Sequence, residues 1–149
     1  MSELFQLYLS LGNKNYGEAI GKIAPYFDTI KPEFVDLKPG YCELVIRNTR
    51  AVHNHLGTVH AIAMCNGAEL AAGLMTDVSI PEGRRWIPVG MTVNYLAMAK
   101  TDLRVVVQGR DIDWTVTGGI EVPVEIIDSN NINVLEAKII MKVSEVSKC

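Results

Sequence analysis

One carboxylate stands among small and apolar residues in the middle of the chain. Glu69 lies in the segment 61–76, which consists mostly of Ala, Gly, Leu, Ile and Met. A helix that is apolar on every side is a buried helix, and burial disfavours an unpaired ionised carboxylate, so we expect a raised pKa for Glu69. A carboxylate in an apolar cleft is a candidate general base or nucleophile. Asn66, three residues earlier, lies on the same face of this helix.

The start of the same predicted helix offers a complementary group. The segment NHLGTVHA, residues 54–61, is a polar turn that contains Gly57 and leads into the helix at about His60. Unpaired backbone N–H groups at a helix start favour a developing negative charge. An oxyanion site there, with a carboxylate two to three turns further along, is a workable arrangement for acyl transfer.

These polar residues also have plainer interpretations. Glu69 could be a partly exposed residue paired with a basic side chain, and Asn54 and His60 could serve only the turn and the helix start. His53, His55 and His60 lie within eight positions and could together hold a metal ion. No other ligand spacing supports a metal, and the glycine turn accounts for the cluster equally well. We therefore expect no metal and no cofactor.

The elements before the central helix are predicted from local signals. Two helices are expected, at about Glu3–Leu11 and about Tyr16–Ile30, and Pro25 should disturb or bend the second. The pair Pro39-Gly40 marks a turn, and the segment CELVIR after it alternates with a period of two, as in a strand.

Four strand-like runs follow the helix, which extends from about His60 to Met75. A loop, SIPEGRR, precedes them, and the separators between them suit antiparallel hairpins. The runs span residues 86–96, 103–112, 120–128 and 133–146. We predict an α+β protein with one domain, residues 1–149, whose first 32 residues are helical decoration.

The composition excludes several classes of protein. A hydrophobic fraction of 48% and a charged fraction of 21% indicate an ordinary globular chain. The net charge of −3 argues against general nucleic-acid binding. No apolar run approaches about 18 residues, so no membrane span is expected, and the start MSELFQ does not resemble a secretory signal. The three cysteines match no metal or disulfide spacing, which indicates a cytoplasmic protein.

The central segment resembles the acyl-CoA thioesterases of the hotdog fold, in particular the phenylacetate-degradation type. Members show an Asn, a His six positions later, and an Asp or Glu nine positions after the His. Asn54, His60 and Glu69 stand at these intervals. The resemblance covers about Tyr41 to Val146. It implies the hotdog fold, in which a curved antiparallel sheet of about five to six strands wraps one long central helix.

The resemblance also implies roles in the hydrolysis of an acyl-CoA thioester. Glu69 would activate water or attack the thioester carbonyl, the Ala61 backbone N–H would polarise the carbonyl oxygen, and Asn54 and His60 would approach the thioester. Family sites lie between subunits, so we expect a homodimer or a dimer of dimers. Further candidates for substrate binding are Gly57, Asn66, Arg84, Arg85 and Asn94.

Two observations keep alternatives open. The arginine pair Arg84-Arg85, expected in the loop after the helix, suits the phosphates of CoA, but an ordinary solvated pair explains it equally well. The family motif HGG is replaced by His60-Ala61-Ile62, whose added side chains narrow the space for a thioester. A non-catalytic acyl-CoA-binding or scaffold protein of the same fold is therefore the second interpretation.

Overall fold

The N-terminal segment forms three short helical elements. The structure, a computed structural model, describes residues 1–147. The three elements are α1 (Glu3–Leu11), α2 (Asn13–Ile23) and the 3-10 helix η1 (Pro25–Ile30). The first has the predicted bounds. The second predicted helix is divided, because Pro25 lacks the N–H that would continue α2 and instead begins η1.

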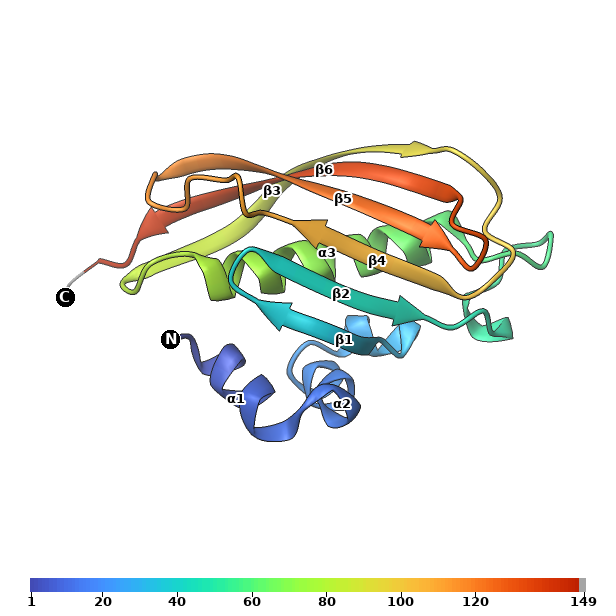
Figure 1. The fold of residues 1–149 in the computed structure, drawn as a ribbon, viewed down its shortest axis with the longest axis horizontal. Coiled ribbons are helices and arrows are strands. Elements are labelled where there is room, and N and C mark those ends of the chain that lie inside the picture. Colours follow the sequence, from blue (N-terminus) through green and yellow to red (C-terminus); the bar gives the residue numbers. More distant parts are fainter. Residues whose placement is uncertain (148–149) are drawn as a thin grey trace.

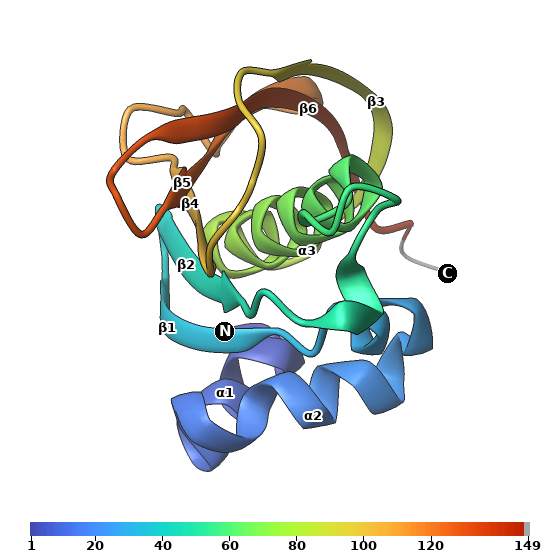
Figure 2. The same cartoon turned by 90° about the vertical axis from the view of Figure 1, so that its right-hand side faces the viewer.

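A six-stranded antiparallel sheet curves around one long helix (Figures 1 and 2). The strands are β1 (Glu33–Lys38), β2 (Tyr41–Ile46), β3 (Arg84–Tyr95), β4 (Leu103–Gln108), β5 (Gly118–Asp128) and β6 (Asn133–Glu145). Their order across the sheet is β1-β2-β4-β5-β6-β3. A short 3-10 helix, η2 (Arg50–Val52), and the long helix α3 (Ala61–Ser79) connect β2 to β3. The predicted arrangement of sheet, central helix and N-terminal helices is confirmed.

One of the predicted hairpins is wrong. The pairs β4–β5 and β5–β6 are adjacent and antiparallel, as expected, but β3 pairs with β6 at the far edge of the sheet. Val105, Val106 and Val107 of β4 are all buried, as a central strand requires, whereas most of β3 is exposed. The turn-like residues between β3 and β4 therefore run from the edge of the sheet, past β6 and β5, to an interior strand.

The small residues of α3 allow the sheet to approach closely. A Cβ added at Gly67 would lie 2.6 Å from Ile46 Cδ1, and one added at Gly73 would lie 2.7 Å from the Trp86 ring. These distances are shorter than real Cβ contacts, so a side chain at either position would require Ile46 or Trp86 to shift. Across residues 1–147, no helix combines the length and apolar character needed to cross a bilayer.

One stripe of α3 stays open. Ile62 is 52% exposed, and Cys65 and Glu69, on the following turns, are half-buried. The prediction of a helix buried on every side is wrong for this stripe, because the sheet, with β1 and β3 as its edges, does not close around α3 (Figure 2).

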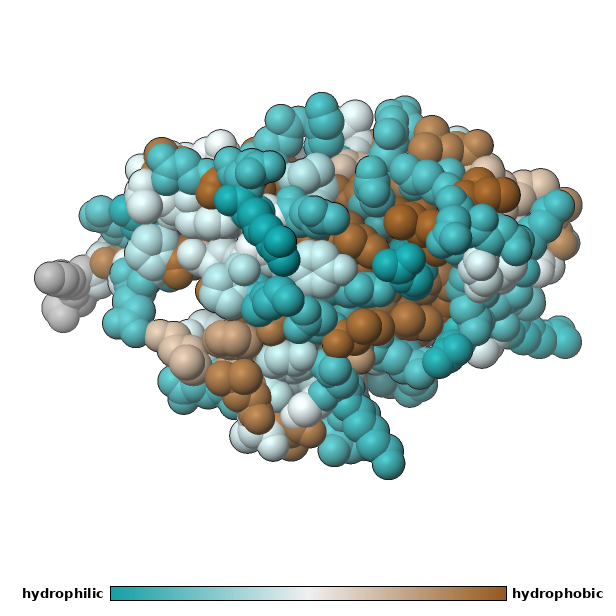
Figure 3. Space-filling view, in the orientation of Figure 1, coloured by the Kyte–Doolittle hydropathy of each residue, from teal (hydrophilic) through white to brown (hydrophobic). Residues whose placement is uncertain are grey.

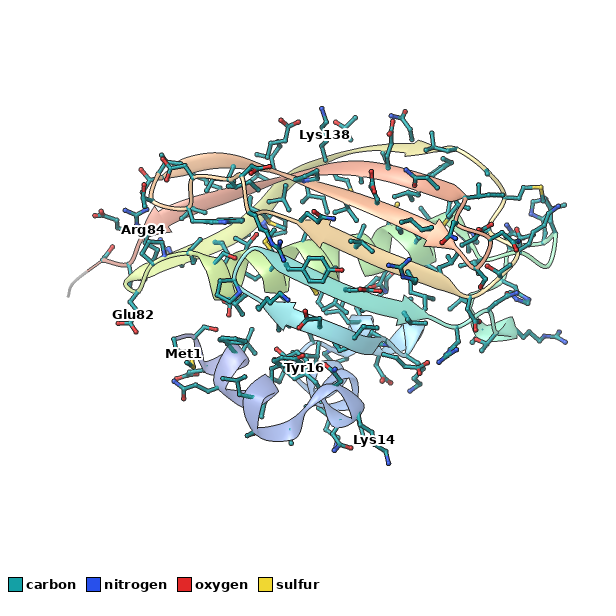
Figure 4. All side chains as sticks on the ribbon, viewed as in Figure 1. Met1, Lys14, Tyr16, Glu82, Arg84 and Lys138 are labelled. Carbon is teal, nitrogen blue, oxygen red and sulfur yellow. The ribbon has the colours of Figure 1, made fainter. Side chains whose placement is uncertain are left out.

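Tyr16 anchors the N-terminal helices beneath the sheet (Figure 4). Its side chain is fully buried, its hydroxyl donates to the Leu4 carbonyl oxygen at 3.0 Å, and its ring packs edge-on against Tyr8 and Phe34. Burial raises the pKa of Tyr16 above its usual range, so the phenol stays protonated and keeps its donor. The helices α1 and α2 are thereby held to each other and to β1.

Gly17 of α2 faces the backbone of Pro32, and we expect Gly17→Ala to destabilise the fold. A Cβ would lie 2.0 Å from the Pro32 carbonyl oxygen, so α2 would have to move away from the segment that leads into β1. Overpacking costs about 1–3 kcal/mol, which outweighs a gain of about 1 kcal/mol in helix propensity. Urea unfolding should show a lower midpoint. Gly90→Ala is the control, because a Cβ there meets nothing within 4 Å. An unchanged midpoint for Gly17→Ala would contradict this packing.

Candidate functional site

The loop before α3 is built around Asn54. Its Oδ1 accepts hydrogen bonds from the amides of Leu56 at 2.9 Å and Thr58 at 3.1 Å, and its Nδ2 donates to Thr58 Oγ1 at 2.8 Å. The turn contains Gly57, whose φ of 76° lies in the left-handed region that favours glycine. Asn54 and Gly57 therefore shape the turn, and Gly57 is exposed at its tip.

His60 is the N-cap of α3. Its Nδ1 accepts a hydrogen bond from the Ile62 amide at 3.0 Å, and its own amide donates to the Val52 carbonyl oxygen at 2.7 Å. The Ala61 amide, at the first helical position, has no hydrogen-bond partner among residues 1–147. A free amide at a helix start is the group that the predicted oxyanion role needs.

We expect capping, rather than proton transfer, to account for His60. His60→Ala should lower the free energy of unfolding by about 1 kcal/mol, whereas His60→Asn should preserve it, because Asn is a strong N-cap residue. Chemical denaturation of both variants measures this. An Asn variant as stable as its parent that no longer hydrolyses thioesters would show instead that the imidazole takes part in the chemistry.

Ala61 and Asn54 share an open groove of about 330 Å³. Its other wall is the end of β3 and the segment that follows, where Tyr95 and Met98 are about half exposed, at 57% and 50%. The Tyr95 hydroxyl lies 3.9 Å from Cys65 Sγ, on the open stripe of α3. The groove therefore joins the helix start to an apolar surface, but Glu69 does not line it.

Glu69 lines a different hollow, two turns further along α3. It is half-buried, and within residues 1–147 its carboxylate makes no ion pair and no hydrogen bond. A salt-bridged Glu69 therefore has no support in the described residues. The hollow has a volume of about 290 Å³ and lies between the N-terminal helices, α3 and the start of β3. Its remaining lining residues are apolar.

The arginine pair does not lie in a loop, as predicted, but begins β3. The Arg84 guanidinium donates to the carbonyl oxygens of Thr115 and Val116, so it holds the loop between β4 and β5. Arg85 is exposed and donates to Ser144 Oγ at 3.3 Å. Both follow the C-terminal end of α3, where Figure 4 shows Arg84, and that end lies about 27 Å along the helix axis from Ala61. One chain does not bring them to Ala61.

Asn66 and Asn94, the two asparagines predicted to bind substrate, lie outside the hollow of Glu69. Asn66 Nδ2 donates to the Tyr26 carbonyl oxygen at 3.2 Å and to Thr29 Oγ1 at 3.1 Å, so it ties α3 to η1. Asn94 donates to Glu136 Oε1 at 3.3 Å and lines a shallow groove on the outer face of the sheet with Lys138 (Figure 4). Neither shares a hollow with Glu69.

The three histidines do not come together within residues 1–147. His53 Nε2 pairs with Asn48 Oδ1 at 2.6 Å. No group of three His, Cys, Asp or Glu side chains gathers as a possible metal site in the part of the chain that the structure describes. The three-histidine interpretation therefore has no support there.

Comparison with known proteins places the chain in a family. A model of the domain of unknown function DUF4442 matches residues 12–143. The crystal structure of genomics APC5556 shares 51% sequence identity, covers 97% of each chain and has a TM-score of 0.90. No curated protein matches the chain.

More distant structures show the same fold. PA5026 from Pseudomonas aeruginosa, named a probable thioesterase, is 19% identical over 90% of this chain and 99% of its own, with a TM-score of 0.76. The protein smu.793 from Streptococcus mutans, bound to acetyl CoA, is 17% identical over 78% of this chain and 91% of its own, with a TM-score of 0.67. The chain therefore belongs to the DUF4442 family and has the hotdog fold.

Proposed function

We propose that the protein is an acyl-CoA thioesterase whose active site combines Glu69 of one subunit with the Ala61 amide of another. The main support for the proposal is the distance between these two groups within one chain. They lie eight residues apart on one helix, about 12 Å along its axis, and they line different hollows. A base and an oxyanion donor must both come within about 3 Å of one reacting centre. Two subunits meet that requirement more readily than one.

A twofold axis near Cys65 would bring the two groups together. When two copies of α3 pack antiparallel, residue 61 of one lies beside residue 69 of the other, because residue 65 is the midpoint. Ile62, Cys65 and Glu69 form the open stripe that such packing would cover, and a twofold interface uses the same patch on both subunits. The edge strand β3 favours the same contact. It exposes Ile87 at 60% and Val89 at 59%, and native proteins cover or pair such edges.

The chemistry would follow from these positions. Glu69, in an apolar hollow, takes a proton from water, and the resulting hydroxide attacks the thioester carbonyl carbon. The Ala61 amide donates to the oxygen that becomes negative. Collapse of the tetrahedral intermediate breaks the carbon–sulfur bond, and the Glu69 carboxyl returns the proton to the CoA thiolate. Asn54 and His60 act here by holding the loop and the cap that present the Ala61 amide.

The comparisons support this proposal at the level of substrate class. One protein of the same fold is named a probable thioesterase, and another was solved with acetyl CoA. Arg85 has an exposed guanidinium that could meet a CoA phosphate, whereas Arg84 is engaged with main-chain carbonyls. The phenylacetate-degradation type, a cytoplasmic location and the absence of a metal or cofactor remain predictions.

The test is thiol release from a panel of acyl-CoA thioesters. Short, medium, long and aromatic acyl groups should be compared, with Glu69→Gln as the control for contaminating hydrolases. The second candidate, an acyl-CoA-binding protein without activity, is favoured by Ile62, which is 52% exposed at the helix start where the family motif has glycine. Binding without thiol release above the Glu69→Gln control would establish that candidate instead.

A further inference from the structure

The hollow beside Glu69 is walled by the N-terminal helices. α1 contributes Leu4, α2 contributes Ile23, and η1 contributes Phe27, while α3 and β3 form the opposite side. The resemblance to the thioesterase family begins at about Tyr41, so this wall lies outside the segment that carries the motif. Within this wall, α1 has no fully buried residue, and hydrophobic residues reach the surface over it (Figure 3).

The lining of this hollow favours an apolar ligand. Glu69 is the one ionisable residue that lines it, and the Trp86 ring, held by a hydrogen bond from Nε1 to Asp77 Oδ1 at 2.9 Å, forms part of the opposite wall. Its volume of about 290 Å³ is nearly twice that of the roughly 150 Å³ apolar cavity that accepts benzene. By that scale it holds on the order of ten carbon atoms.

Packing and hydrogen bonds hold this wall against the rest of the protein. Tyr16 is buried and bonded to the Leu4 carbonyl oxygen, and Asn66 bonds η1 to α3. Because both ends of the N-terminal segment are tied to the core, its side chains can set the size of the hollow.

We infer that α1, α2 and η1 form the wall of an acyl-chain pocket whose open end is at Glu69. The inference rests on the proposed function and adds a substrate class to it: apolar acyl groups of about ten carbons. Ala24, at the end of α2, is the size-determining position, because a larger side chain there projects into the hollow.

Ala24→Leu should shorten the acyl chain that the protein accepts. Each methylene buried raises affinity about fourfold, so a leucine that displaces two methylenes should weaken binding on the order of tenfold. Isothermal titration calorimetry with the thioethers S-decyl-CoA and S-ethyl-CoA, which cannot be hydrolysed, measures this directly. We expect the parent to prefer S-decyl-CoA, and Ala24→Leu to reduce that preference on the order of tenfold while S-ethyl-CoA binding stays unchanged.

Two further variants complete the test. Ala19→Leu makes the same change on α2 at a residue that does not line the hollow, and it should keep the parent's preference. Phe27→Leu widens the hollow and should extend the accepted chain, which keeps the test decisive if Ala24→Leu does not fold. Equal weakening of both thioethers by Ala24→Leu, or no change with either variant, would overturn the pocket.

The two proposals fail in different ways. A parent that prefers S-decyl-CoA but releases no thiol from any acyl-CoA refutes the thioesterase and keeps the pocket. A parent that hydrolyses acyl-CoA thioesters but binds both thioethers equally refutes the pocket and keeps the thioesterase.

Discussion

Glu69→Gln should lower the turnover of a cleaved acyl-CoA by a factor of about 10²–10⁴, the usual share of general acid–base catalysis. Gln keeps the volume of the side chain and removes the base. The variant should remain as stable as its parent, because Glu69 has no ion-pair partner among residues 1–147 that its removal would strand. Turnover and melting temperature should be measured on the same preparation.

A matched variant separates catalysis from a general effect of charge. Glu125→Gln makes the same change at an exposed position of β5 and should alter neither property. If Glu69→Gln melts several degrees lower yet hydrolyses at the parent rate, Glu69 is a structural residue and the proposed mechanism is wrong.

Ala61→Pro should abolish most activity by removing one backbone amide. Loss of an oxyanion donor costs about 10²–10³ in kcat. Proline is tolerated at the first helical position, where the amide has no intrahelical partner, and the preceding His60, with φ −63° and ψ 138°, already has the extended backbone that proline requires. Ala61→Ser, which keeps the amide, is the control and should retain activity.

Mixed dimers of Ala61→Pro and Glu69→Gln should regain activity that neither variant has alone. In a heterodimer, one site combines the intact Ala61 amide of the Glu69→Gln chain with the intact Glu69 of the other, and the second site lacks both groups. Random pairing makes half of the dimers heterodimers with one intact site of two, so roughly a quarter of parental activity should return. The measurement is thiol release after the two variants are unfolded and refolded together.

The outcome of mixing decides where the site lies. Recovery requires groups from two subunits, since each homodimer lacks one group in both sites. Mixtures as inactive as the separate variants would contradict a shared site, and so would a parent protein that is active while sedimentation equilibrium shows only monomer at micromolar concentration.

The central helix and the candidate residues on it could be named from the sequence because their signals are local. The run of small and apolar residues around Glu69 predicts a helix packed closely against other elements, and a Cβ at Gly67 or Gly73 would indeed come within 3 Å of a side chain from the sheet. Pro25 marks the end of α2 because its ring removes a backbone donor wherever it stands. The spacing of Asn54, His60 and Glu69 also lies within one short segment.

Long-range pairing could not be predicted in the same way. The residues between β3 and β4 look like a hairpin turn, but burial of Val105, Val106 and Val107 requires neighbours on both sides of β4, and β2 and β5 supply them. Trp86 lines the hollow beside Glu69, and Tyr95 lines the groove beside Ala61, but neither is predicted from the sequence as a site residue. Side chains alternate between the two faces of β3, but the face that contacts α3 can be assigned to Trp86 only once the partner strand is known.

The sequence by itself determined the central helix, five of the strands, the hotdog resemblance and the residues able to do chemistry, since propensity, periodicity and spacing act between near neighbours. Only the tertiary structure decided which of those residues share a hollow. It separates Ala61 from Glu69 and surrounds Glu69 with side chains from helices that lie more than 40 residues earlier in the chain. The physical reason is that a pocket is formed by surfaces that meet after packing, and no local pattern encodes which surfaces these are.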